Sequence, residues 1–181
     1  IEDIGINTKG QFTDLQDTPI ETMFKLYPWE WMMSEEFSER IPGSNVRFIE
    51  PGWKAILSNK GLLPLLWEMF EGHPNLLPAY FDGDPAATAL EGNYVRKPLF
   101  SREGANIEFF EGGEQTINID GDYGAEGHIV QALNPLPHFN GNYPMIGSWL
   151  VASQPCGICI REDATLVTGD DARFVPHIIL G

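Results

Sequence analysis

The stretch YVRKPLFSREGANIEFF, residues 94–110, contains two β-rich runs separated by a turn of small residues. Tyr, Val, Ile and Phe favour strands, whereas Gly104 and its neighbours favour a tight turn. Further short β-rich runs follow along the chain, each bounded by Gly, Asn or Pro: QTINIDG, HIVQALNPL, MIGSWLVASQ and CGICIRED. This pattern predicts a largely antiparallel sheet in residues 93–181.

The first half of the chain has apolar residues at helical spacing. One helix is expected over IETMFKLYPWEWMMSEEFS, with Pro19 at its first position and Pro28 kinking or dividing it. A second helical stretch runs up to Phe70. Ser58 and Asn59 within it are expected to cap a new helix, with Pro64 near the first turn of that helix. Short strands are expected in residues 1–16 and 46–50. The fold class is therefore predicted as α+β, with a predominantly antiparallel sheet, packed helices and a helical subregion of about residues 17–81.

Composition limits the class of protein. A chain of 181 residues with 43% apolar content is long and apolar enough to bury a core. No apolar run reaches the roughly 18 residues that span a bilayer, and no basic and apolar leader is present, so we expect a cytoplasmic protein. The chain opens with Ile1 and enters a strand-like run at once, which indicates a piece of a longer protein.

The formal net charge of −15 argues against binding to nucleic acid, because neutralising phosphates requires clustered Lys and Arg over a broad face. An acidic surface permits a cationic partner, although solubility is its ordinary explanation. Cys156 and Cys159 have C-x-x-C spacing inside an apolar run, and we interpret them as core thiols. His128, His138 and His177 lie among apolar strands and are interpreted as structural.

The few cations gather around one turn. Arg96, Lys97 and Arg102 lie close together, beside Ser101 and Gly104, although the chain has only 11 Lys and Arg against 26 carboxylates. A lysine on a strand beside Gly and Ser suits a phosphate, because small residues let backbone N–H groups approach its oxygens. An ion pair with a nearby glutamate is the alternative. Arg96 must point to the opposite strand face from Lys97 and is predicted to be a structural ion pair.

Two other cations lie on different elements. Lys60 precedes a predicted helix, where a lysine is unfavourable unless an anion is present. Arg161 follows the apolar strand CGICI and precedes two acids. The ordinary explanation for Lys60 is solvation, and that for Arg161 is an ion pair with Glu162 or Asp163. Together with Lys97, however, these cations could surround a polyphosphate.

A further segment could accept a nucleotide base. The run HIVQALNP ends with Gln131, Ala132, Leu133 and Asn134 before a proline, so backbone amides leave the sheet beside apolar side chains. An adenine ring needs such a slot, although a plain sheet edge has the same pattern.

The order of several long segments resembles the synthetase region of the glutathionylspermidine synthase family. They are MFKLYPWEWM, EPGWKAILSNKGLLPLLWEMFEGHPNLLPAYF, YVRKPLFSREGANI, YGAEGHIVQALNPLPHFNGNYPMIGSWLV and GICIREDATLVTGDDARFVPHIIL. The resemblance implies an ATP-grasp fold, of which residues 1–181 would be the C-terminal part. It also implies an ATP-dependent carboxylate–amine ligase that forms an amide through an acyl phosphate, with glutathione as the acid and spermidine as the amine.

The resemblance also assigns roles to residues. Lys60 and Lys97 would contact the nucleotide, Ser101 and Gly104 would belong to a mobile loop over the phosphates, residues 131–134 would hold adenine, and Arg161 would stabilise the transferring phosphoryl group. The magnesium ligands expected in such an enzyme have no equivalent here and would lie upstream, in a missing N-terminal part. We therefore expect the isolated fragment to be inactive. A nucleotide-binding member without ligase activity, acting as an interaction or regulatory module, and a purely structural domain are the alternatives.

Overall fold

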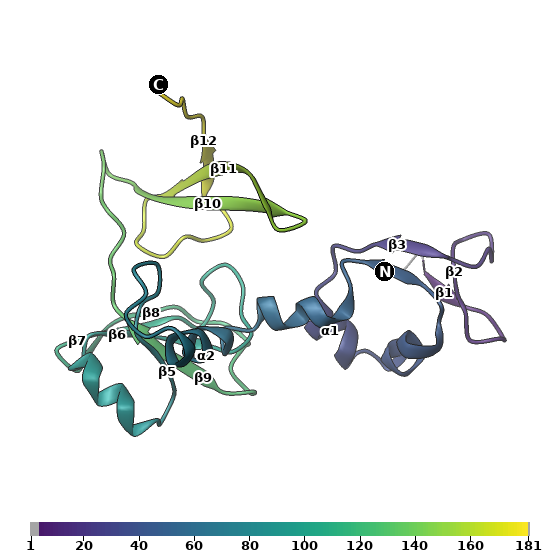
Figure 1. Ribbon diagram of the computed structural model, residues 1–181, viewed down its shortest axis with the longest axis horizontal. Coiled ribbons are helices and arrows are strands. Elements are labelled where there is room, and N and C mark those ends of the chain that lie inside the picture. Colours follow the sequence, from purple (N-terminus) through teal and green to yellow (C-terminus); the bar gives the residue numbers. More distant parts are fainter. Residues whose placement is uncertain (1–3, 181) are drawn as a thin grey trace. The chain divides into compact units, whose positions relative to one another are not determined.

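The computed structural model describes residues 4–180 and has an α+β architecture (Figure 1). The chain divides into two compact units, Ile1–Leu62 and Leu63–Gly181, which we call unit 1 and unit 2. The predicted α+β class with mainly antiparallel sheets is confirmed.

The described residues of unit 1 form two small sheets and three short helices. Strands β1 (Gly5–Ile6) and β2 (Phe12–Thr13) pair antiparallel, as expected for the first 16 residues. Strands β3 (Thr22–Phe24) and β4 (Arg47–Ile49) pair parallel. The helices are α1 (Trp29–Ser34) and the 3₁₀ helices η1 (Glu36–Gly43) and η2 (Gly52–Ser58).

Aromatic side chains form the core of unit 1. Phe12, Trp29 and Met32 are buried, and the Trp29 ring lies edge-on to Phe48 with 5.1 Å between ring centroids. The Phe12 ring meets Phe37 in the same edge-on manner at 6.0 Å. Edge-to-face packing of this kind adds to the stabilisation from buried area.

The prediction of a long helix after Pro19 is wrong for the residues before Pro28. Those residues form β3, and the helix begins only at Trp29. A proline disfavours helical backbone at the residue before it, so Tyr27 cannot continue a helix into Pro28. The preceding segment instead gains hydrogen bonds from β4, including Lys25 N–H to the Ile49 carbonyl at 3.0 Å.

The second helical stretch is divided as its capping residues predict. Helix η2 ends at Ser58, and α2 (Leu62–Met69) begins after Asn59. The Asn59 side chain accepts a hydrogen bond from Gly61 N–H at 2.7 Å, and Pro64 lies in the first turn of α2, where its missing N–H costs nothing.

Unit 2 contains a five-stranded antiparallel sheet in the order β5-β9-β6-β7-β8. The strands are β5 (Ala79–Phe81), β6 (Tyr94–Pro98), β7 (Glu108–Glu111), β8 (Glu114–Asn118) and β9 (His128–Ala132), and η3 (Pro85–Leu90) follows β5. Gly112 and Gly113 both have positive φ and form the two-residue turn between β7 and β8. Glycine at both positions suits the tight hairpin turns that match strand twist.

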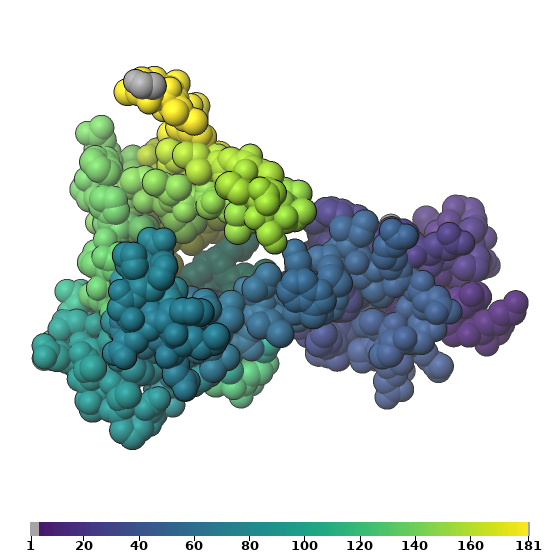
Figure 2. All heavy atoms as spheres, in the orientation of Figure 1, coloured from purple at the N-terminus to yellow at the C-terminus, as the bar shows by residue number. Residues whose placement is uncertain are grey.

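A second sheet of unit 2 consists of β10 (Tyr143–Val151), β11 (Gln154–Asp163) and β12 (Arg173–Val175), all antiparallel. The end of the β10–β11 hairpin projects in yellow-green in Figure 2, and Trp149, Leu150 and Val151 there are exposed. The register shifts between Trp149 and Leu150, which leaves Cys156 opposite no residue of β10. A bulge of this kind increases local strand twist.

Candidate functional site

Strand β6 directs its two adjacent cations to opposite faces of the five-stranded sheet. Cross-strand partners share a face, and the register pairs Lys97 with Ile129, and Arg96 with Val130 and Glu108. Lys97 therefore lies on the face that carries the buried side chain of Ile129. Arg96 lies on the other face, as the alternation along the sequence predicted.

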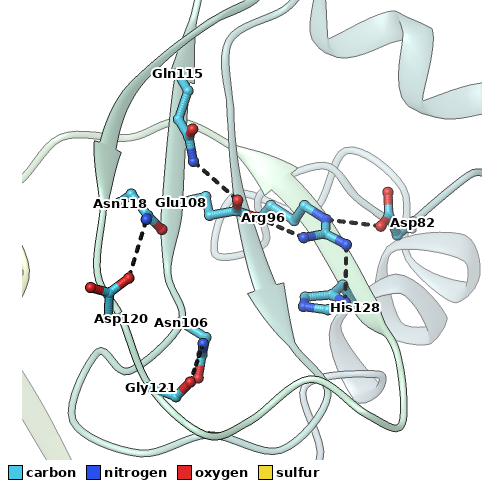
Figure 3. A network of polar contacts seen from close by, with 9 residues as sticks. All are labelled: Asp82, Arg96, Asn106, Glu108, Gln115, Asn118, Asp120, Gly121 and His128. Atoms are coloured by element: carbon cyan, nitrogen blue, oxygen red, sulfur yellow. Dashed lines mark hydrogen bonds and ion pairs between the residues drawn. The ribbon is translucent and has the colours of Figure 1, made fainter.

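Arg96 is the centre of a polar network (Figure 3). Its Nε donates to Asp82 Oδ2 at 2.9 Å and one terminal nitrogen donates to Glu108 Oε2 at 2.7 Å. The other terminal nitrogen lies 3.1 Å from His128 Nδ1. Burial by itself lowers the pKa of Arg96, but the hydrogen bonds and charges of Glu108 and Asp82 outweigh it and raise the pKa. The predicted structural ion pair is confirmed.

His128 takes its electrostatic environment from the same network. Desolvation lowers its pKa, and repulsion from Arg96 lowers it further, against the opposing charges of Asp82 and Glu108. The lowered pKa favours the neutral imidazole at neutral pH, with Nδ1 beside the Arg96 guanidinium. His128 lies on the face away from Lys97, and its structural role stays a prediction.

We expect Arg96→Met to destabilise the intact protein by about 1 to 2 kcal/mol, because two partly exposed carboxylates lose their shared partner. This loss of stability lies between the loss expected for a surface ion pair and that expected for a fully buried ion pair. Arg173→Met is the matched control, since Arg173 makes one 2.7 Å pair with Glu162 from a side chain that is 64% exposed. Urea unfolding monitored by circular dichroism measures both variants. Equal effects of the two substitutions would contradict a structural role specific to Arg96.

A cavity of about 270 Å³ lies on the Lys97 face of unit 2. Six of the nine residues predicted for the site line it: Lys97, Gly104, Gln131, Ala132, Leu133 and Asn134. Its remaining walls are largely apolar and include Val95 and Phe109 from the sheet and Met145 from β10. The cavity thus combines one cation and a few polar groups with apolar surface, which is typical of a small-molecule site.

Lys97 is held in place on the cavity wall. Its Nζ donates to Gln131 Oε1 at 2.8 Å, from β6 to the neighbouring strand β9. Gln131 is only 9% exposed, so its side chain has little access to water as an alternative partner. The Lys97–Gln131 contact therefore orients the ammonium group on the cavity wall.

The segment predicted to hold adenine leaves the sheet at the cavity, but two of its amides are already used. Ala132 N–H donates to the Pro78 carbonyl at 2.8 Å, and Leu133 N–H donates to the Asn93 carbonyl at 3.2 Å. Within residues 4–180, Asn134 N–H donates to no backbone carbonyl. Among the amides of residues 132–134, that of Asn134 is therefore the one that no described backbone carbonyl engages.

The loop between β6 and β7 meets a second loop at the cavity. Gly104 has a φ of +77°, and a Cβ built there would overlap Val167 Cγ1. Asn106 fixes the end of the same loop, because its side chain donates to the Gly121 carbonyl and accepts from Tyr123 N–H, both at 2.8 Å. Gly104 is thus required for close packing of the two loops. Ser101 lies on the same loop but does not line the cavity.

Arg161 lies beside the cavity rather than on its wall. It is paired across the strands with Met145, which lines the cavity, and with Phe174 of β12. One terminal nitrogen donates to the Gly169 carbonyl at 2.8 Å, while the buried Nε meets no hydrogen-bond acceptor among the described residues. A buried donor without a partner is costly, so this Nε is available to a ligand acceptor or a water.

The loop from Ala164 to Gly169 is a part of the cavity wall that our sequence analysis missed. Asp163 organises it, since its carboxylate accepts from Thr165 N–H at 2.9 Å and from Gly169 N–H at 3.1 Å. These backbone hydrogen bonds lower the pKa of Asp163. Leu166, Val167 and Thr168 line the cavity as a result. The spacing of Asp163 and Thr165 is typical of an Asx turn and could have indicated the loop, though not its location.

Lys60 belongs to unit 1 and immediately precedes α2, where the sequence placed it. The structure describes each unit by itself, so the association of Lys60 with the cavity stays a prediction.

Other expected roles need correction. Cys156 is exposed and Cys159 is half-buried, so the two cysteines are not core thiols. They fall on a hairpin whose apolar residues near the turn face solvent, and the apolar run therefore marks an exposed strand. His138 and His177 are exposed, and the ring of His138 lies 4.8 Å from that of Tyr143, so their structural role stays a prediction.

Metal and membrane features were sought in residues 4–180. These residues bring together no group of three His, Cys, Asp or Glu side chains suited to a metal ion. None of their helices has the length and hydropathy needed to cross a bilayer.

Comparison with known proteins adds the family to this geometry. The sequence model described as "Glutathionylspermidine synthase preATP-grasp" matches residues 1–180. The chain belongs to the glutathionylspermidine synthase family. This membership confirms the resemblance that the motifs had indicated.

Curated relatives share these segments over nearly the whole chain. A Haemophilus influenzae protein named "Putative acid--amine ligase" is 46% identical over 98% of this chain and 47% of its own length. Trypanothione synthetase of Crithidia fasciculata is 29% identical over 96% of this chain and 30% of its own length. The bifunctional glutathionylspermidine synthetase/amidase of Escherichia coli is 26% identical over 99% of this chain and 33% of its own length. The chain thus spans less than half the length of each relative, within a family of acid–amine ligases.

Proposed function

We propose that this chain supplies the nucleotide-binding side of an ATP-dependent acid–amine ligase with an ATP-grasp fold. The observation that carries the proposal is the cavity of about 270 Å³ that unites Lys97, Gly104 and residues 131–134. Its apolar walls suit a planar base, and Asn134 could pair with the base edge. Lys97 and the loop around Gly104 would face the phosphates.

The residues beside the cavity fit an anionic ligand. Lys97 presents an oriented ammonium group on the cavity wall, and Arg161 has a buried Nε without a partner in the described part of the chain. Both donors are fixed before any ligand arrives, which is the arrangement that favours stabilisation of developing charge. Lys60, Ser101 and Arg161 complete the proposed set at the phosphate end.

In the proposed reaction, a carboxylate oxygen attacks the terminal phosphorus of ATP, and the bond from that phosphorus to the bridging oxygen breaks to release ADP. The resulting acyl phosphate is attacked by an amine, phosphate leaves, and an amide forms with loss of a proton from nitrogen. The Escherichia coli relative is named a glutathionylspermidine synthetase/amidase, so we propose glutathione as the acid and spermidine as the amine.

Residues 4–180 bring together no group of three His, Cys, Asp or Glu side chains that could hold a metal ion, and we propose that the magnesium ligands lie outside this chain. We also propose that this chain lies toward the C-terminus of a longer enzyme. The metal ligands and most of the acid pocket would then lie in polypeptide outside residues 1–181. Consistent with this assignment, we expect the fragment alone to be inactive.

The test is phosphate release by the full-length protein with ATP, magnesium, glutathione and a panel of polyamines. We expect release that requires both acid and amine, with the amide product detected by mass spectrometry. ATP binding without amine-dependent release would instead support a nucleotide-binding interaction module. Unchanged nucleotide affinity after substitution of both Lys60 and Lys97 would support a purely structural domain.

A further inference from the structure

The parallel pair β3–β4 of unit 1 is incomplete as a sheet. Parallel strands are normally buried on both faces and belong to larger sheets. Here Phe24 and Ile49 are cross-strand partners, yet their side chains are 72% and 45% exposed, and Leu26 just beyond β3 is 86% exposed. The pair therefore presents apolar surface where a folded protein would normally have a covering layer.

One backbone edge of β3 is open. Arg47 N–H donates to the Glu21 carbonyl and Lys25 N–H donates to the Ile49 carbonyl, so the odd-numbered residues of this segment direct their backbone groups toward β4. The alternation of strand hydrogen bonding then directs the backbone groups of Thr22, Phe24 and Leu26 to the opposite edge. Among residues 4–180, no strand pairs with β3 at that edge.

An apolar groove of about 380 Å³ borders β3. Consecutive residues 23–27 all line it, so it runs beside the end of β3 and the residues that follow, and it also reaches Phe48 of β4. Ile6, Phe12 and Phe48 supply further apolar wall. An open edge beside an apolar groove is the arrangement that accepts an added strand.

We propose that a segment of the same polypeptide outside residues 1–181 adds to β3 as a further strand and fills this groove. The segment would be extended and apolar at alternate positions, with every second side chain entering the groove. This proposal concerns assembly of the protein and does not depend on its ligase activity.

Two observations favour the same polypeptide over other occupants. The Haemophilus influenzae relative, 46% identical to this chain, has more than half of its length outside the matched region, so such proteins contain ample further chain. The net charge of −15 opposes close contact between two copies of this chain. A covalently linked segment also has a high effective concentration and keeps an aggregation-prone edge covered.

Photo-crosslinking in the full-length protein tests the proposal without disrupting the fold. Benzoylphenylalanine replaces Leu26, whose side chain is 86% exposed, and the matched control replaces Leu15, which is 70% exposed and outside the groove. We expect the probe at position 26 to crosslink within one molecule to a peptide outside residues 1–181. A crosslinked dimer, a crosslink only to residues 1–181, or no more crosslinking than at position 15 would overturn the proposal.

Hydrogen exchange provides a second measurement on the unmodified protein. In the full-length protein, the Phe24 and Leu26 amides should exchange at least about tenfold more slowly than the amide of Leu15, a residue outside the groove, because the added strand closes their edge. Exchange at Phe24 and Leu26 as fast as at Leu15 would contradict strand addition. Neither measurement requires ATP or catalysis, so failure here and failure of the proposed reaction are distinguishable.

Discussion

Replacing Lys97 with alanine is expected to lower kcat/KM for amine-dependent phosphate release by at least about a hundredfold, the scale for losing one preorganised charge. The Lys97 ammonium lies on the cavity wall and is oriented by Gln131 at 2.8 Å, on a side chain that the sheet already fixes. Removing it deletes the one cationic side chain among the residues that line this cavity of unit 2. The full-length protein is assayed at saturating acid and amine while ATP is varied.

Two controls separate a role in the site from a general effect of charge. Lys9→Ala removes a lysine from an exposed turn of unit 1 and should leave the rate unchanged. Gln131→Leu keeps the ammonium but removes its orienting partner, and it should have a smaller effect than Lys97→Ala. A Lys97→Ala enzyme within threefold of wild type, with unchanged ATP affinity, would refute phosphate binding by Lys97.

Arg161→Ala is expected to lower kcat by at least about a hundredfold, with a smaller change in the affinity for ATP. The guanidinium holds the Gly169 carbonyl at 2.8 Å with one nitrogen and keeps a buried Nε free of acceptors within the described residues. A group that meets its acceptor only as charge develops contributes to the transition state more than to ground-state binding. Single-turnover phosphate release measures this difference.

Arg161→Lys distinguishes contact with the phosphoryl group from support of the neighbouring loop. A lysine could still donate to the Gly169 carbonyl, but it lacks the second, directed donor of the guanidinium. We expect loop geometry to be retained, as monitored by exchange of the Leu166 and Val167 amides, without recovery of the rate. Arg173→Ala, on the adjacent strand β12, is the matched control and should be near wild type. Full rescue by lysine would assign Arg161 a positioning role only.

Local patterns predicted much of unit 2. Strands β6 to β11 fall in the β-rich runs of the sequence. The alternation along β6 correctly placed Arg96 and Lys97 on opposite faces. Six of the nine predicted site residues line one cavity, although their binding of nucleotide stays a prediction. These successes share a cause, because strand alternation and turn residues are properties of short segments.

The failures involve contacts between distant segments. Residues 22–24 have helical spacing of apolar side chains but form a strand, because Pro28 ends any helix and β4, more than 20 residues later, supplies hydrogen bonds. Cys156 and Cys159 lie in an apolar run, but the apolar residues near the turn of the hairpin that carries them face solvent. Periodicity cannot predict which surface a segment meets.

The sequence by itself determined the α+β class, the positions of the strands in unit 2 and the separation of Arg96 from Lys97, because each depends on the chemistry of neighbouring residues. Only the tertiary structure decided that the Asp163-centred loop closes the cavity against Gly104, and that Arg161 lies beside that cavity instead of lining it. Those placements follow from where the loop after β6 meets the loop after β11, and that meeting depends on side chains that are far apart along the chain.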